Sequence, residues 1–168
     1  MSDDQKKLLG EWYRRVTLSS QSHYNHAQWL SKANLWLGAT AAVISAIIGT
    51  SVFATLQQNI AIWIRIIVAS LSISAAILAA FQTLFNFSDR AEKHRIYGSK
   101  YGAIRRKIDM VISQNKLSDD EFKGLTAEIS VRLDDFASEA PKIPSKVWLK
   151  TEERYKKRFS IEFPFKEI

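Results

Sequence analysis

The sequence contains no cysteine, and only three of its 168 residues are proline and six are glycine. The absence of cysteine excludes disulfide bonds, thiolate metal sites and cysteine nucleophiles. The scarcity of proline and glycine excludes a collagen-like chain, and the 46% of hydrophobic residues excludes a disordered chain of low hydrophobicity. A chain of this length has room for one domain or one compact module.

Charged residues are missing from two long stretches. There are 32 uncharged residues between Lys32 and Arg65, and 23 between Arg65 and Asp89. A helix that crosses a hydrocarbon core of about 30 Å needs about 20 mostly apolar residues. Residues 35–56 and 66–87 each supply 22, so we predict two transmembrane helices. The alternative is a pair of helices buried in a soluble core, but such helices usually run shorter, and a small globule has few ways to surround two of them.

The orientation of this hairpin follows from the residues around it. The first 34 residues are of mixed charge and the apolar run after them is too long for a signal peptide, so we expect an uncleaved anchor. Residues 57–65 connect the two spans and contain one basic residue, Arg65, whereas seven basic residues follow the second span within 20 positions. The positive-inside rule therefore places both termini in the cytoplasm, and the net charge of +7 is mainly a topology signal. Trp36 and Trp63, near opposite ends of the hairpin, are typical interfacial aromatics.

We predict that the segments outside the membrane are also helical, which makes the chain an all-α membrane protein with a cytoplasmic helical layer from both termini. The expected parts are an N-terminal helix in 1–34 that continues into the first span, the hairpin in 35–87 and a helical region in 88–168. Apolar or small residues recur there at helical spacing. These faces are Leu9, Trp12, Val16, Ser20, His23, Ala27 and Leu30, then Ile96, Tyr97, Tyr101, Ile104, Ile108 and Val111, and finally Phe122, Leu125, Ile129, Leu133 and Phe136.

Local signals divide the C-terminal region. We expect Asn115 to end the first helix after the hairpin, and Ser118 with Glu121 forms a capping box that begins the next one. The two prolines in 140–144 disfavour helix in the residues before them. A short helix is expected over 146–158. No strand pattern and no internal repeat is present.

Motifs for chemistry are missing. The chain has no phosphate-binding loop, dinucleotide-binding turn, nucleophile elbow or zinc-protease helix, so we expect no enzyme and no cofactor. His23 and His26 lie three residues apart on a helix, but a metal site needs three or four ligands and no third is evident. Packing and hydrogen bonding at a helix seam is the favoured role. His94 lies in a polar run, where a solvated or hydrogen-bonded role is the default.

The basic surplus has three explanations: nucleic-acid binding, binding of anionic lipid and enforcement of topology. Basic residues in 90–107 directly follow a membrane exit, where each is worth ~1 kcal/mol against an anionic leaflet. Lipid and topology therefore account for them first. The stretch 154–159 interleaves aromatic and basic residues, which suits nucleic acid, lipid or a partner protein with low specificity. The sequence carries no strong nucleic-acid signal.

Each span has a stripe of small or polar residues. Gly38, Ala42, Ser45, Ala46 and Gly49 form the first stripe, and Ser72, Ala75, Ala79, Gln82 and Asn86 form the second. Small stripes let helices approach closely in lipid, so packing within a hairpin or between copies is one interpretation. The other is that Ser72, Gln82 and Asn86 line a water-filled passage when several hairpins assemble. Ser45, Gly49, Ser72, Gln82 and Asn86 are thus candidate pore-lining or helix-packing residues.

Three long blocks carry a family resemblance: LLGEWYRRVTLSSQSHYNHA before the first span, WLGATAAVISAIIGTSVFATL within it, and FNFSDRAEKHRIYGSKYGAIRRKID after the second. They resemble the SLATT domain, a two-transmembrane effector domain of bacterial defence and conflict systems that is associated with nucleotidyltransferases and nucleotide-sensing domains. The resemblance covers residues 8–148, and the whole chain is expected to form one such domain.

The resemblance implies a cell-suicide effector that oligomerises and forms a pore or disrupts the bacterial inner membrane. It supplies no catalytic residues. The trigger would be a separate protein, a nucleotide second messenger from a nucleotidyltransferase, or a reverse transcriptase system. Candidate contacts for an anionic ligand or lipid are Arg14, Arg15, Arg95, Arg105 and Arg106, which can also pair with carboxylates. A membrane scaffold that recruits a separate enzyme is the second hypothesis, and a soluble nucleic-acid binder is the third.

Overall fold

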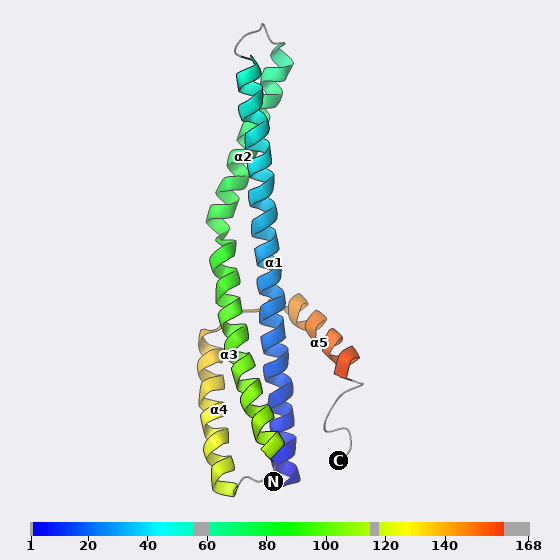
Figure 1. Ribbon diagram of the computed structural model, residues 1–168, viewed down its shortest axis with the longest axis vertical. Helices are drawn as coiled ribbons and strands as arrows, with labels where there is room; N and C mark the ends of the chain where they lie inside the picture. The colour runs from blue at the N-terminus through cyan, green and yellow to red at the C-terminus, as the bar shows by residue number, and fades with distance from the viewer. Residues whose placement is uncertain (1, 56–60, 115–117, 160–168) are drawn as a thin grey trace. The chain divides into compact units, whose positions relative to one another are not determined.

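The computed structural model describes residues 2–55, 61–114 and 118–159, and these residues form five α-helices with no strand among them (Figure 1). The helices are α1 (Asp3–Thr55), α2 (Ile62–Phe85), α3 (Phe87–Gln114), α4 (Asp119–Glu139) and α5 (Ser145–Phe159). They fall into two compact units: a hairpin unit, residues 29–90, and a polar unit, residues 1–28 and 91–168. The all-α fold predicted from the sequence is confirmed.

The hairpin unit is an antiparallel pair made by the second half of α1 and by α2. The less exposed residues of each helix recur every three and four positions, which is the heptad spacing of two helices that pack along one seam. These seam residues are Asn34, Leu37, Ala41, Ile44, Ile48 and Ser51 on α1, and Ile64, Val68, Leu71, Ala75, Leu78 and Gln82 on α2. Among these seam residues only Ala75 is buried, because two helices alone cannot enclose a core.

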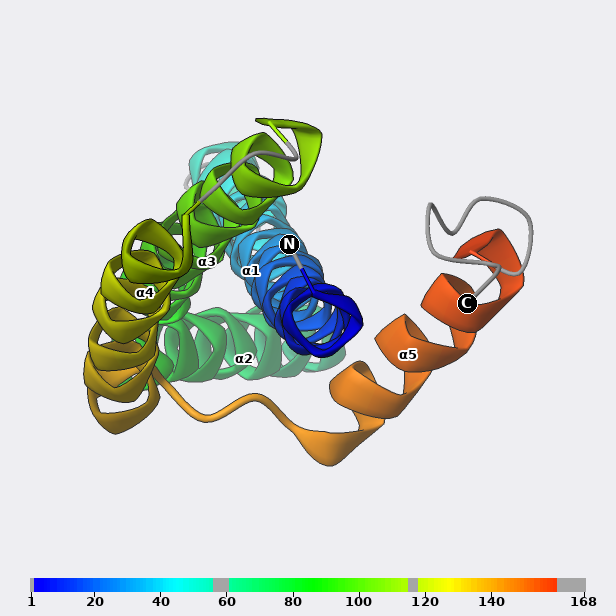
Figure 2. The same ribbon diagram turned by 90° about the horizontal axis from the view of Figure 1, so that it is seen from below.

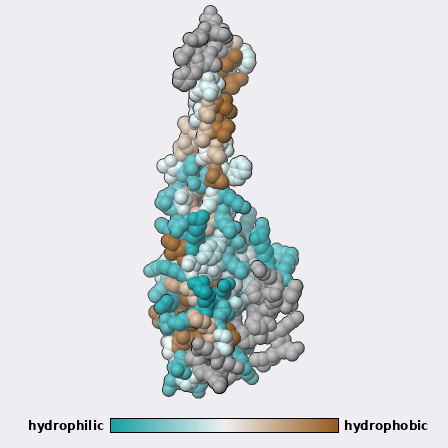
Figure 3. Space-filling view, in the orientation of Figure 1, coloured by the Kyte–Doolittle hydropathy of each residue, from teal (hydrophilic) through white to brown (hydrophobic). Residues whose placement is uncertain are grey.

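Large apolar side chains are exposed over much of the hairpin unit outside the seam (Figure 3). Both helices are long and apolar enough to cross a membrane, and the most apolar window of each is not buried by the chain. This exposure argues against the alternative of two helices buried in a soluble core. The exposed residues are Leu35, Trp36, Val43, Ile47, Ile62, Trp63, Ile66, Ile67, Ile73, Ile77, Phe81, Leu84 and Phe85.

The hairpin differs from the prediction at its connector. Helix α2 begins at Ile62, so Trp63 and Arg65 belong to its first turns and not to the loop in which the sequence analysis placed them. The prediction failed because helical propensity and the apolar run are both continuous across Arg65, which was wrongly taken as a boundary. Leu56, the predicted end of the first span, and Asn115, the predicted end of a later helix, lie outside the described residues.

The polar unit packs the first half of α1 against α3 and α4. Its core contains the predicted faces of all three helices, and the buried residues are Leu9, Val16, Tyr101, Ile104, Ile108, Val111, Phe122 and Ile129. One residue of the predicted α3 face is wrong, because Ile96 is 46% exposed. The buried stripe instead runs back through Gly98, His94 and Ala91, which keep the same spacing as Tyr101.

Polar contacts fix the outer helices of the polar unit. Lys107 of α3 pairs with Glu128 of α4, and the Tyr97 hydroxyl donates to Glu139 at 2.9 Å. On the opposite side of the α1–α3 pair, α5 is held by an ion pair of 3.1 Å between Arg14 and Glu152 (Figure 2). The predicted capping box is present, with the Ser118 hydroxyl accepting from the Glu121 backbone and the Glu121 carboxylate accepting from the Ser118 backbone.

Helices α1 and α3 approach closely at Gly98. A Cβ atom at this position would lie 3.1 Å from Cε2 of Tyr24, and the Ser20 hydroxyl donates to the Gly98 carbonyl at 2.7 Å. A side chain at Gly98 would therefore meet an aromatic ring and would separate a buried hydrogen bond. Gly124 on α4 has no atom within 4 Å of its Cβ position, so it provides a natural comparison.

We expect Gly98→Leu to lower the free energy of unfolding by about 1–3 kcal/mol, the usual cost of overpacking. Gly124→Leu should raise it by roughly 0.5–1 kcal/mol, because leucine is the better helix former and has open space there. Denaturant unfolding of the detergent-solubilised protein, followed by circular dichroism, measures both. Equal effects of the two substitutions would contradict the close approach at Gly98.

Candidate functional site

Part of the predicted stripes lies beside the hairpin seam, whereas Ala75 and Gln82 of the second stripe lie in the seam itself. On α1, Ala42, Ser45 and Ala46 are exposed and Gly49 is half-buried, with no atom within 4 Å of its Cβ position. On α2 the corresponding exposed residues are Ser72, Ala76, Ala79 and Thr83, again three and four positions apart. We call these eight residues the small-residue face.

Helical geometry places the two halves of this face on the same side of the hairpin. Successive residues of a helix are about 100° apart. When each helix is viewed from its own N-terminus, its small residues lie to the same side of its seam residues as in the other helix. Because the helices are antiparallel, the two sets come together on one side. The opposite side carries bulkier residues, including Ile47, Phe81 and Phe85. The hairpin thus has one side shaped for close helix approach and another suited to lipid chains.

Hydroxyl groups in the hairpin bond to the backbone of their own helix. Ser72 donates to the Val68 carbonyl and Ser74 donates to the Ser70 carbonyl, each at 2.9 Å. Thr50 donates to the carbonyls of Ala46 and Ile47. Such bonds let polar side chains face lipid without leaving a donor unsatisfied. A hydroxyl that is satisfied in this way does not require a water-filled passage.

Gln82 lies in the seam and joins the two helices. Its amide Nε2 donates to Asn34 Oδ1 at 3.1 Å. The amide fits because position 38 is glycine, whose Cβ position lies 3.0 Å from the same nitrogen. Of the two roles foreseen for Gln82, this contact is the helix-packing one.

Asn86 separates α2 from α3 and lies outside both helices. Its backbone has φ 43° and ψ 51°, the left-handed conformation that ends α2, and its amide donates to the Asp89 carboxylate. The predicted second span, which ran to Phe87 as one helix, therefore ends at Phe85. Helical spacing suggested that Asn86 continues the stripe of Gln82, but a left-handed residue turns the chain out of that register.

We expect Asn86→Gly to preserve stability, since glycine adopts the left-handed conformation without strain. Asn86→Ala should cost about 1 kcal/mol, because other side chains clash with the backbone there. Thermal unfolding and dye leakage from liposomes, measured on both variants, separate the two roles of Asn86. Both variants remove the amide, so an amide that lines a pore predicts the same loss of dye leakage in both. Equal loss of leakage with unchanged stability would contradict the capping role.

All three histidines of the chain lie together in the polar unit. His23, His26 and His94 are buried, with 2%, 5% and 2% of their surface exposed. Nδ1 of His23 lies 2.9 Å from Nδ1 of His94, and the His26 ring meets the His94 ring edge-on with centroids 4.6 Å apart. Packing and hydrogen bonding at a helix seam were foreseen for His23 and His26. His94 is hydrogen-bonded but not solvated as its polar neighbours suggested.

The surroundings of the histidine cluster favour neutral imidazoles. Burial, with a contribution from His26, lowers the pKa of His23 from 6.5 to about 4. The Tyr101 ring stacks on His23 with centroids 5.6 Å apart and covers it on one side. Protonation of His23 would therefore place a positive charge in a buried environment that stabilises it poorly.

We expect the free energy of unfolding to be constant above pH 6.5 and to fall as the pH is lowered from there toward 4, because over this range the unfolded chain binds a proton at His23 that the folded chain does not. Each kcal/mol lost lowers Tm by about 2–4 °C. Thermal unfolding measured at intervals of pH tests this, with His23→Gln as the variant in which the dependence weakens.

The same titration contains its own control. Hydrogen bonds from Ser118, Lys107 and Lys157 lower the pKa values of Glu121, Glu128 and Glu153, respectively, from 4.5, so these carboxylates affect stability only below about that pH. A loss of stability confined to lower pH would therefore belong to the carboxylates and would contradict the assignment to His23.

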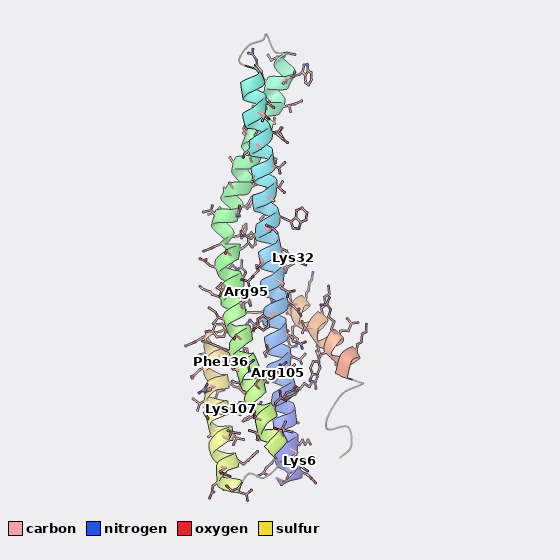
Figure 4. The ribbon with its side chains drawn as sticks, in the orientation of Figure 1. Lys6, Lys32, Arg95, Arg105, Lys107 and Phe136 are labelled. Atoms are coloured by element: carbon pink, nitrogen blue, oxygen red, sulfur yellow. The ribbon has the colours of Figure 1, made fainter. Side chains whose placement is uncertain are left out.

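The five candidate arginines do not form one site. Arg14 bonds to Glu152 at 3.1 Å and joins α1 to α5, while Arg95 bonds to Glu92 at 3.3 Å within α3. Figure 4 shows Arg95 and Arg105 far apart along α3, consistent with ten intervening helical steps of about 1.5 Å. Both ion pairs are partly exposed surface contacts, and such pairs contribute little to stability.

Arg105 differs from the other four arginines. Its Nε atom is buried and has no hydrogen-bond partner among the residues that the structure describes. Arg15 and Arg106 are exposed on the same unit. Burial raises the pKa of Tyr101, and the positive charge of Arg15 partly offsets this effect. The arginines therefore include links between elements, exposed charges and one guanidinium whose Nε is buried.

Sequence reasoning missed most of the seam residues and the buried pairing of His94 with His23. The seam could have been found by testing the apolar spans for heptad spacing in place of small residues alone. His94 could have been found by extending the stripe of Tyr101 backward through Gly98. Within 2–55, 61–114 and 118–159, no group of three or more potential ligands is arranged to hold a metal ion.

Comparison with known proteins gives one match. Residues 6–167 match the family model described as SMODS and SLOG-associating 2TM effector domain family 4. No curated protein and no solved structure matches the chain. The matched residues include both units, and the two-transmembrane description agrees with the two apolar helices.

Proposed function

Since the chain belongs to family 4 of the SMODS and SLOG-associating 2TM effector domains, the resemblance seen in its sequence is correct, and we propose how this effector acts. Copies of the hairpin associate through the small-residue face and form a pore or disrupt the inner membrane. Both termini lie in the cytoplasm, where a nucleotide second messenger or a protein signal controls the assembly.

The observation that supports this proposal is the two-sided hairpin. One side presents small residues and hydroxyls that let another helix approach closely, and the other presents large apolar side chains. In lipid, helices associate through close packing and not through the hydrophobic effect, so a small side is the favoured contact between copies. One hairpin cannot enclose a passage, so permeation requires several.

The most closely matched pair of variants uses two serines of α2. Ser72 lies on the small-residue face and Ser74 lies on the opposite side, yet both are exposed and both bond to the backbone four residues earlier. We expect Ser72→Leu to reduce both the number of subunits per assembly and dye leakage from liposomes. Ser74→Leu should leave both unchanged. Single-molecule photobleaching counts the subunits in the same liposomes.

Gly49→Leu extends the test to α1. Among the residues that the structure describes, no atom lies within 4 Å of the Cβ position of Gly49. The leucine should therefore leave the hairpin folded and block contact between copies. The proposal fails if neither Ser72→Leu nor Gly49→Leu changes assembly or leakage.

The second hypothesis, a membrane scaffold that recruits a separate enzyme, predicts a different pattern. The hairpin substitutions would then be harmless, whereas substitutions of exposed arginines of the polar unit, such as Arg15 and Arg106, would abolish activity in cells. Growth arrest and a membrane-potential dye, followed together after induced expression, separate the two hypotheses, because a scaffold arrests growth without rapid depolarisation.

A further inference from the structure

The buried histidines lie in the part of the α1–α3 contact that precedes Tyr101 on α3. The apolar core of the polar unit reaches α3 from Tyr101 onward, and the part of α3 before Tyr101 contributes none of its buried members. Before Tyr101, the buried residues of α3 are Ala91, His94 and Gly98, two of which are small. Of these three residues His94 has the largest side chain, and it contacts His23 and His26 of α1.

The contact between His23 and His94 depends on protonation. At 2.9 Å, one Nδ1 carries a hydrogen and the other is bare and accepts it. When both rings are charged, every ring nitrogen carries a hydrogen, so two N–H groups face each other and two positive charges repel. His26, edge-on to His94, adds a third titratable ring to the same buried space.

The charged groups described around the cluster act on its aromatic neighbours, Tyr97 and Tyr101. From α3, Lys100 lies 4.5 Å above the Tyr97 ring, and from α4, Glu139 accepts from the Tyr97 hydroxyl. Arg15 of α1 acts on Tyr101, the ring stacked on His23. On α5, the neutral Thr151 accepts a hydrogen bond from Asn25 of α1 at 3.0 Å.

We propose that the histidine cluster is a proton-operated latch between α1 and α3, closed when the imidazoles are neutral and opened when the cluster takes up protons. Opening separates the end of α3 around residues 91–98 from α1, while the apolar core from Tyr101 onward stays packed. The latch is a property of the polar unit alone. Its effect on the membrane, which is to favour assembly at low pH, rests on the function proposed above.

The chain offers a direct test because it has no cysteine. Gln28 of α1 and Lys93 of α3 are exposed residues that flank the histidines. Spin labels on Gln28→Cys and Lys93→Cys in the full-length protein report the separation of the helices by electron–electron resonance. We expect the distance distribution to lengthen and broaden as the pH is lowered from about 6.5 toward about 4, the interval between the ordinary pKa of a histidine and that of buried His23.

Two controls define the result. Labels on Lys123→Cys and Val131→Cys, both exposed on α4, should keep their distance unless the unit unfolds as a whole. The variant in which all three histidines are glutamine should show no dependence on pH. A distance that does not change in the native sequence, or a change that persists in the triple variant, overturns the latch. Histidine NMR signals, which arise only from this cluster, show whether protons have bound.

Leakage from liposomes is measured on the same samples and distinguishes the two proposals. If the labels separate at low pH and leakage rises several-fold, both proposals are supported. If the labels separate and no leakage occurs at any pH, the latch stands and the proposed pore or membrane disruption fails. Leakage that rises at low pH with unchanged label distances supports the function and overturns the latch.

Discussion

Every polar group in the membrane must be satisfied within the chain, because a bilayer core offers no water to replace a missing partner. The hairpin meets this constraint in two ways. Hydroxyls such as those of Ser72 and Ser74 bond to carbonyls of their own helix, and in the seam the amide of Gln82 bonds to the amide of Asn34 on the facing helix. Glycine at position 38 makes room for that amide. With its polar groups satisfied internally, the outer surface of the hairpin can specialise into a small side and a bulky side.

The polar unit is stabilised in a different way. Its helices lie partly in water and can bury an apolar core, which they do between α1, α3 and α4. Close approach at Gly98 and the buried histidines continue the seam beyond that core. The unit is therefore held by two kinds of contact. The apolar contacts are insensitive to pH, whereas the imidazole contacts are not, since burial lowers the pKa of His23 to about 4.

Much of this fold can be predicted from the sequence, because it is encoded in local periodicity. The helical faces of α1 and α4, the capping box at Ser118 and the break before α5 were all found in this way. Asn86 was not, because its four-residue spacing from Gln82 mimics a continuing helix and the left-handed backbone leaves no periodic signal. His94 was masked by charged neighbours, and its pairing with His23 joins residues 71 positions apart, which periodicity within one helix does not reveal. The two-sided character of the hairpin needed both the burial pattern and the antiparallel arrangement.

The heptad spacing of the hairpin has a geometric consequence for any larger structure. Residues that repeat every 3.5 positions drift around an ideal helix, so a contact line that follows them winds as a left-handed ribbon. The small residues of α2 from Ser72 to Thr83 keep this repeat. Helices packed along such a line cross at about 20° instead of lying parallel. Copies joined through it would be tilted around a common axis, and the space that they enclose would be narrowest near the middle of the helices.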